Sequence, residues 1–137
     1  MSETIPSTQH AVQLTGPDEL RINTEKKVFE PGAHQVLCKT EAVGLCFSDL
    51  KLLKQYDKHA RKEHILQGVD ESILAEIPSY VPDSRPTVPG HETTVRIVAV
   101  GDQVRDVRPG ARYLVETDYR WLPTTNSNAS FGYNFEG

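Results

Sequence analysis

The sequence of 137 residues predicts a mainly β fold, a small β-barrel that carries helical insertions. Three observations support this fold class. Roughly five or six short segments either alternate polar and apolar residues or are rich in β-branched residues. Turns that contain proline or glycine separate these segments. The chain has no internal repeat, and its length fits one domain with a modest core.

The first two segments, 10–14 and 20–23, form a predicted β-hairpin. Both alternate, and the T-G-P-D sequence between them is typical of a turn. A second turn, E-P-G at 30–32, precedes a strand that we predict over 35–43. We expect one face of this strand to carry Val36, Cys38, Thr40 and Ala42.

Two helices are predicted in the middle of the chain. The first begins at Ser48-Asp49, because a short apolar face follows it. The second covers 65–77, where apolar residues recur with a helical period in spite of Gly68. An extended, irregular segment should follow, because four prolines interrupt it: Pro78, Pro82, Pro86 and Pro89.

The clearest strand is predicted at 93–100, which is rich in β-branched residues. Gly101-Asp102 turns the chain, R-P-G at 108–110 turns it again, and 111–116 is a further predicted strand. The last segment is polar and aromatic, with Tyr119, Trp121, Phe131, Tyr133 and Phe135.

Composition excludes several classes of protein. Charged residues make up 25% and hydrophobic residues 37%, as in ordinary globular proteins, and no apolar run approaches the ~20 residues of a membrane span. The N-terminus does not resemble a secretion signal. The net charge of −4 argues against nucleic acid as a partner. Two cysteines are too few for a disulfide framework, so we expect a cytoplasmic protein.

Cys46 and His91 point most directly to chemistry. Each follows a glycine-containing turn, in V-G-L-C-F-S-D and V-P-G-H-E, and a hydroxyl or carboxylate lies close behind it. Zinc binds thiolate and imidazole, and a catalytic zinc keeps one position open. Taken alone, Cys46 is more often a buried structural thiol, and His91 a hydrogen-bonded structural histidine. The two motifs together favour a zinc site.

Asp49 is the candidate partner for the second ring nitrogen of His91, because metal-bound histidines usually donate that N–H to a carboxylate or carbonyl. Asp49 fits equally well as a helix-capping residue, and the two roles do not exclude each other. The G-x-G-x-x-G signature of dinucleotide-binding folds is absent, so the sequence contains no recognisable site for a nicotinamide cofactor.

The motifs between about His10 and Glu116 resemble the zinc-containing alcohol and polyol dehydrogenases of the medium-chain family. The similarity is carried by Q-V-L-C-K-T-E-A-V-G-L-C-F-S-D-L, V-P-G-H-E, V-A-V-G-D-Q-V and V-R-P-G-A-R-Y, in that order. It implies that residues 1–137 are a GroES-like catalytic domain, a partly open β-barrel that is incomplete here, with 57–86 as an insertion. It also implies that a separate Rossmann domain, absent from this chain, binds NAD or NADP.

The resemblance assigns roles by position. Cys46 and His91 match two ligands of the catalytic zinc, and Glu92 matches the carboxylate beside the metal, a candidate third ligand. Ser48 matches the hydroxyl that passes the substrate's proton toward solvent, and Asp49 matches the residue that steadies the site. The implied reaction is reversible hydride transfer between an alcohol and a ketone or aldehyde, with Zn²⁺ as Lewis acid and NAD or NADP as the hydride carrier.

Some residues depart from the family pattern. Phe47 replaces a small or basic residue, and Val95 replaces a glycine. The four-cysteine lobe that holds a structural zinc is missing, which favours the polyol dehydrogenases, and the tail hints at sugars or sugar phosphates as substrates. The family's further zinc ligand is expected past Gly137. We therefore expect weakened zinc binding and no dehydrogenase activity from this chain alone.

The sequence thus predicts the catalytic-domain portion of a zinc-dependent NAD(P) alcohol dehydrogenase that acts on a polyol, sugar or sugar phosphate. Its expected partners are a small alcohol or ketone and further copies of itself in a homo-oligomer, with no nucleic acid and no membrane. One alternative is a stand-alone GroES-like module that binds a partner without catalysis. Another is a zinc-free, quinone-reductase-like relative. Both alternatives are opposed by the retained Cys46, Ser48, Asp49, His91 and Glu92.

Overall fold

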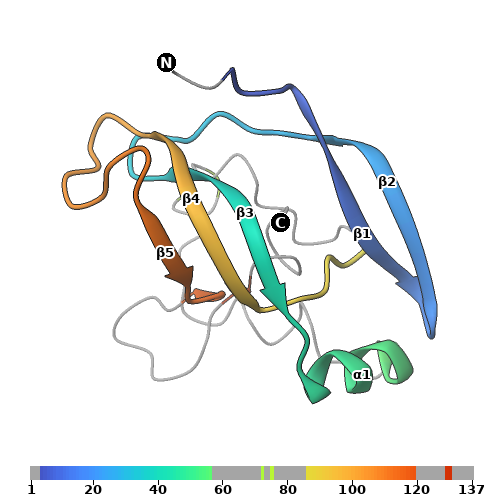
Figure 1. The fold of residues 1–137 in the computed structure, drawn as a ribbon. Helices are drawn as coiled ribbons and strands as arrows, with labels where there is room; N and C mark the ends of the chain where they lie inside the picture. The colour runs from blue at the N-terminus through green and yellow to red at the C-terminus, as the bar shows by residue number, and fades with distance from the viewer. Residues whose placement is uncertain (1–3, 57–71, 73–74, 76–85, 120–128, 131–137) are drawn as a thin grey trace.

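The computed structural model describes residues 4–56, 72, 75, 86–119 and 129–130. All the strand pairs in this part of the chain are antiparallel, so the structure confirms the expected mainly β class. In Figure 1, the helix labelled α1 lies below the strands. The elements, in chain order, are β1 (Thr8–Gly16), β2 (Glu19–Lys27), β3 (Val36–Gly44), α1 (Phe47–Lys54), β4 (Glu92–Val100), β5 (Arg112–Val115), β6 (Asp118–Tyr119) and β7 (Ala129–Ser130).

The predicted hairpin is formed by β1 and β2, which extend beyond the alternating residues at both ends. Val12 pairs with Ile22 and Leu14 pairs with Leu20. Asp18 closes the turn in the left-handed region, with φ of 55°, a conformation that aspartate tolerates better than most residues.

A three-stranded sheet, in the order β3-β4-β5, contributes further buried apolar residues to the core. The β-branched residues of β4 make it the central strand, and its inward residues Val95 and Ile97 are 4% and 3% exposed. The single face expected from Val36 to Ala42 of β3 does not run unbroken, because Glu41 is an extra residue between the pairs of Thr40 and Ala42 with β4. Most residues of β3 are exposed, although Cys38 is half-buried opposite Ile97.

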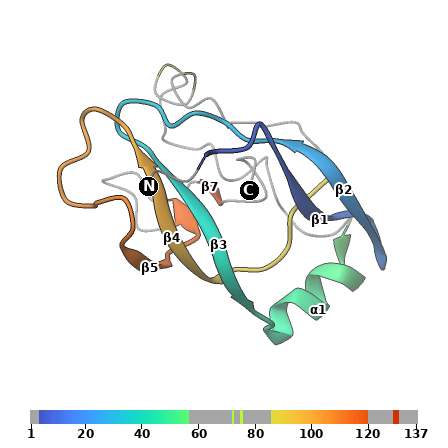
Figure 2. The same ribbon diagram turned by 45° about the horizontal axis from the view of Figure 1, so that its top comes forward.

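The helix α1 begins where the sequence predicts it and packs on the hairpin. Leu52 of α1, and Tyr56 just past the end of the helix, are buried against Leu14 of β1. The backbone N–H of Asp18 also donates to the carbonyl of Leu53, over 3.0 Å. Figures 1 and 2 both show α1 beyond the end of β3, beside the turn between β1 and β2.

A second tether joins the hairpin to the segment before β4. Leu14 and Thr87 exchange two backbone hydrogen bonds, of 2.7 and 3.0 Å, and both side chains are fully buried. The hairpin thus holds both segments that lead into the candidate site: α1 on one side and residues 86–91 on the other.

Some expectations concern parts of the chain that the structure does not describe. The expected insertion at 57–86 and the expected helix at 65–77 lie outside the described residues, apart from Ser72, Ala75 and Pro86. Most of the aromatic tail does too. In the described part, no helix has the length and apolar character needed to cross a membrane.

Candidate metal centre

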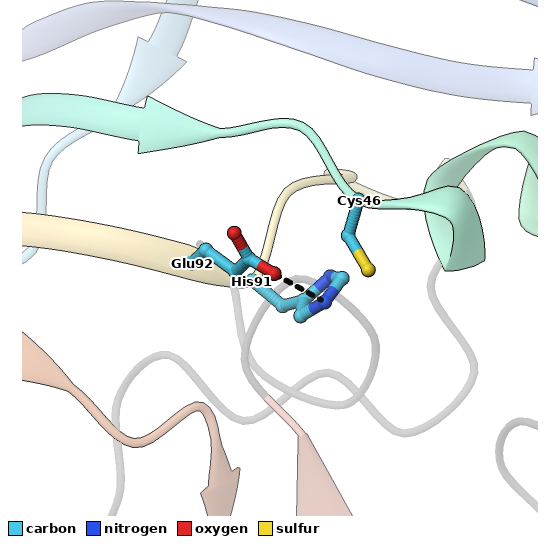
Figure 3. Close-up of side chains that lie close together, drawn as sticks. All are labelled: Cys46, His91 and Glu92. Carbon is cyan, nitrogen blue, oxygen red and sulfur yellow. Dashed lines mark ion pairs between the residues drawn. The ribbon is translucent and has the colours of Figure 1, made fainter.

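Three side chains that can bind a metal lie together where β3 ends and β4 begins. The potential ligand atoms of Cys46, His91 and Glu92 are all within 4.8 Å of one another. In the described residues, no other group of three His, Cys, Asp or Glu is gathered in this way. Figure 3 shows the sulfur and the carboxylate both directed toward the imidazole.

The sheet register explains how residues so far apart in sequence meet. Gly44, the last residue of β3, pairs with Glu92, the first residue of β4. Because the strands run antiparallel, β3 ends at the same edge of the sheet at which β4 begins. Cys46, just after the end of β3, and His91, just before the start of β4, are therefore brought together. Gly90 turns the chain just before His91 with φ of +97°, a conformation that suits glycine.

Asp49 connects the two segments that carry these side chains. Its Oδ2 accepts a hydrogen bond from the backbone N–H of Cys46 over 2.9 Å, and its Oδ1 accepts one from Gly90 over 3.3 Å. The same Oδ1 lies 3.4 Å from Nδ1 of His91. Asp49 therefore has the geometry of a helix-capping residue and of a histidine partner at once, and it is buried.

The opposite nitrogen of the His91 ring faces the other polar groups. Ser48 Oγ lies 3.3 Å from Nε2, and Oε1 of Glu92 lies 4.0 Å from it. With Asp49 on the Nδ1 side, the N–H of the neutral ring is best placed on Nδ1, which leaves the Nε2 lone pair for a ligand. The ring is thus oriented as metal-binding histidines are.

Hydrogen bonds and neighbouring charges shift the pKa values of Cys46 and His91 in opposite directions. Hydrogen bonds from the side chain and backbone of Ser48, and then from His91, lower the pKa of Cys46, against the effects of burial and of the Glu92 charge. Burial acts to lower the pKa of His91, but the hydrogen bond to Cys46 and the charges of Asp49 and Cys46 together raise it. By contrast, burial raises the pKa of Cys38, which lies outside the group.

The donor set fits zinc. A thiolate, an imidazole and a carboxylate are the three kinds of protein ligand that zinc prefers. Bond lengths of about 2.0–2.3 Å place donors on one zinc roughly 3–4 Å apart, so modest side-chain rotations would bring these atoms to one ion. Three protein donors also leave a position for a small molecule, which is the pattern of a catalytic zinc.

Sequence reasoning found each of these side chains but not the surfaces around them. Leu45 and Phe47 flank Cys46 and are 91% and 69% exposed. Lys51 Nζ lies 5.6 Å from the centre of the Phe47 ring, so a cation covers one face of that ring. The close approach of Gly44 to Glu92 was also missed, since the only signal for it was a glycine at the end of a predicted strand.

Comparison with known proteins identifies the family of this domain. The family described as "Alcohol dehydrogenase GroES-like domain" matches residues 32–130. Sorbitol dehydrogenase from Bos taurus is 34% identical over 101 residues, which cover 74% of this chain and 22% of that protein. A sorbitol dehydrogenase sequence from Sus scrofa is 33% identical over 101 residues and is covered to 82%. The chain thus spans about a fifth of the bovine relative.

Solved structures share the fold. A protein from Sinorhizobium meliloti, assigned as a zinc-binding dehydrogenase and bound to NADP, superposes with a TM-score of 0.65 at 24% identity. The match covers 96% of this chain and 34% of that one. An Escherichia coli oxidoreductase/dehydrogenase of unknown specificity gives 0.55 at 21% identity, over 92% of this chain and 36% of the other.

Proposed function

This chain belongs to the family of alcohol dehydrogenase GroES-like domains, and we propose that it is the catalytic-domain portion of a zinc-dependent NAD(P) alcohol dehydrogenase. The proposed reaction is reversible hydride transfer between a polyol, sugar or sugar phosphate and the corresponding ketone or aldehyde. The sorbitol dehydrogenases among its relatives favour a polyol.

The observation that carries the proposal is the gathering of a thiolate, an imidazole and a carboxylate within 4.8 Å. These groups come from two segments separated by the whole middle of the chain. A domain that only bound a macromolecular partner would have no use for this combination at one end of its sheet. We therefore assign Cys46, His91 and Glu92 as zinc ligands.

The residues around the metal position have separate tasks. Zinc at this site would supply a Lewis acid that polarises the oxygen of the substrate. Asp49 holds the His91 ring through Nδ1, so that Nε2 is directed at the metal position. Ser48 Oγ, exposed and 3.3 Å from Nε2, is placed to take a proton from the alcohol and pass it to solvent.

The hydride carrier is NAD or NADP, which we assign mainly to a Rossmann domain outside these residues. Phe47 stands at the edge of the site, where it can contact the cofactor or the substrate through its exposed ring. We also propose that the parent protein is a cytoplasmic homo-oligomer.

The first test is a metal titration of the purified, metal-free chain. Cobalt(II) serves as the probe because a thiolate–cobalt charge-transfer band reports the Cys46 ligand directly, and zinc is then added in competition. We expect one ion per chain. Cys46→Ala, His91→Ala and Glu92→Ala should each weaken binding, while matched replacements outside the group, Cys38→Ala, His34→Ala and Glu30→Ala, should not.

Two results decide between the proposal and its main alternative. Absence of binding, or equal binding by all six variants, would contradict the zinc centre and favour a GroES-like binding module without catalysis. For the substrate class, sorbitol should perturb the cobalt absorption of the loaded chain. If metal binds but sorbitol has no effect, the polyol assignment fails and the metal assignment stands. The chain alone should not reduce NAD or NADP.

A further inference from the structure

Gly44 and Glu92 form a cross-strand pair in which the glycine leaves space that the glutamate fills. The two residues face each other at the end of the β3–β4 ladder. A Cβ atom built on Gly44 would lie 2.6 Å from Oε2 of Glu92, 3.0 Å from its Cβ and 3.5 Å from its Cδ. The Glu92 side chain therefore lies across the bare backbone of Gly44, in the position that a side chain would otherwise occupy.

The contact with Gly44 involves the carboxylate of Glu92, whose oxygens are the candidate metal-binding atoms. Its Oε1 faces the imidazole, 4.0 Å from Nε2 of His91, while Oε2 rests over Gly44. The three atoms nearest to the added Cβ all belong to Glu92. A methyl group on residue 44 would thus act on the carboxylate before it acted on any other part of the protein.

The backbone of Gly44 does not itself require glycine, because its φ lies outside the left-handed region in which Gly90 and Gly110 are found. The atom closest to the added Cβ is also the far end of a flexible, 56% exposed side chain. The carboxylate of Glu92 can therefore rotate away, whereas its Cβ, 3.0 Å from the added atom, is fixed to the backbone and must shift with the strand by a few tenths of an ångström. The loss would fall on the position of the carboxylate.

We propose that Gly44 is a positioning residue of the metal centre, which directs the Glu92 carboxylate toward Cys46 and His91 by leaving it room beside the sheet. This inference rests on the proposed zinc function and adds a residue with no donor atom to the set that determines metal affinity. Supporting residues of this kind typically change metal affinity by about 10- to 100-fold.

The chain provides a matched control in Gly16. This glycine also ends a strand, pairs across a hairpin with a glutamate, and would place an added Cβ 3.2 Å from that carboxylate, in Glu19. Neither residue of this second pair belongs to the candidate metal group. Gly16→Ala therefore reproduces the chemical change of Gly44→Ala at a glycine–glutamate pair outside the metal centre.

The experiment is a double-mutant cycle on cobalt(II) and zinc affinity, with four chains: wild type, Gly44→Ala, Glu92→Ala and the double variant. We expect Gly44→Ala to weaken binding about 10-fold or more and to change the cobalt spectrum, with little change in the urea midpoint of the metal-free chain. In the Glu92→Ala background, Gly44→Ala should have little further effect on metal affinity, because the carboxylate that it displaces is gone. Gly16→Ala should bind as wild type does.

Several outcomes would overturn the inference. Unchanged affinity in Gly44→Ala, or an equal loss with and without Glu92, would show that Gly44 does not act through the carboxylate. If Gly44→Ala fails to fold, folding restored by Glu92→Gly, which removes the Cβ as well as the carboxylate, would support the steric contact, and a double variant that still fails would refute it. Failure of the proposed function itself looks different, since wild type would then bind no metal at all.

Discussion

Oδ1 of Asp49 lies 3.4 Å from Nδ1 of His91, although the two residues belong to segments on opposite sides of the middle of the chain. The same carboxylate accepts hydrogen bonds from the backbone on both sides, at Cys46 and at Gly90. One buried acid thus fixes the distance between the two segments and the rotation of the imidazole. In this way Asp49 positions the candidate metal centre although it lies outside the group of candidate ligands.

Replacing this acid should therefore weaken metal binding. Asp49→Asn keeps an oxygen acceptor but loses the negative charge that holds the Nδ1–H of His91. We expect zinc affinity to fall by about 10- to 100-fold, measured by competition with a chelator at fixed pH. Asp102→Asn, at an exposed turn after β4, is the control. Equal affinity in Asp49→Asn and wild type would contradict the role assigned to Asp49.

The acid stability of the sheet should depend on Glu41. Its carboxylate binds Arg112, and Arg96 over 2.8 Å, so that one acid joins β3, β4 and β5. The hydrogen bond from Arg112, followed by the contacts with Arg96, holds the pKa of Glu41 below its usual 4.5. Because the pKa is lowered in the folded state, this stabilisation is present above about pH 4.5 and is lost as the pH falls through the folded-state pKa.

The measurement is the urea midpoint of unfolding of wild type and Glu41→Gln, from pH 7 down to below pH 4.5. Wild type should be the more stable at pH 7, and the difference should shrink as acid protonates Glu41. Glu25→Gln, exposed on β2, provides the comparison. A wild-type advantage that persists unchanged into acid would show that the ion pairs are not its source.

The contact between α1 and the hairpin should contribute strongly to stability. Leu52 is 2% exposed and packs against Leu14 and Tyr56, whereas Leu50 on the same helix is 53% exposed. Leu52→Ala should lower the free energy of unfolding by about 2–5 kcal/mol. Leu50→Ala should change it by roughly 0.5 kcal/mol or less. Urea denaturation monitored by circular dichroism gives both values, and similar losses for the two would refute this packing.

Gly101 should tolerate alanine much less well than Gly44 does. A Cβ on Gly101 would lie 2.1 Å from the carbonyl oxygen of Gly32 and 2.3 Å from that of Ala33. These are backbone atoms, which cannot rotate away as the Glu92 side chain can. We expect Gly101→Ala to cost about 1–3 kcal/mol of stability, more than Gly44→Ala. Thermal melting of the two metal-free variants would show the order, and the reverse order would contradict it.

Much of the fold could be predicted because its signals are local. The hairpin, β4 and the start of α1 each follow from a short period or a turn next to it, and the structure places them at the predicted residues. The motif around Cys46 and the one around His91 are equally local, so the candidate ligands were found. Their roles in catalysis and metal binding stay predictions.

What the sequence did not predict depends on pairing between distant residues. The register shifts between β3 and β4 arise from the pairing of the two strands, and no period within β3 reveals them. The bridge between Leu14 and Thr87 joins residues far apart in the chain. Likewise, the space beside Gly44 can be assigned to Glu92 only when the pairing of the two residues across the sheet is known. In each case the sequence does not show which distant residue lies opposite.

The bridge between Leu14 and Thr87 links the N-terminal hairpin to the segment that carries His91, a candidate metal ligand, although no residue of the hairpin belongs to the candidate ligands. A ligand that binds only the folded state stabilises everything that must be folded for it to bind. Zinc at the site would therefore slow the exchange of the Leu14 and Thr87 amide hydrogens with solvent. Conversely, a hairpin that opens more often would release the metal more readily. The first strand thus acts as a distant reporter of whether the site is filled.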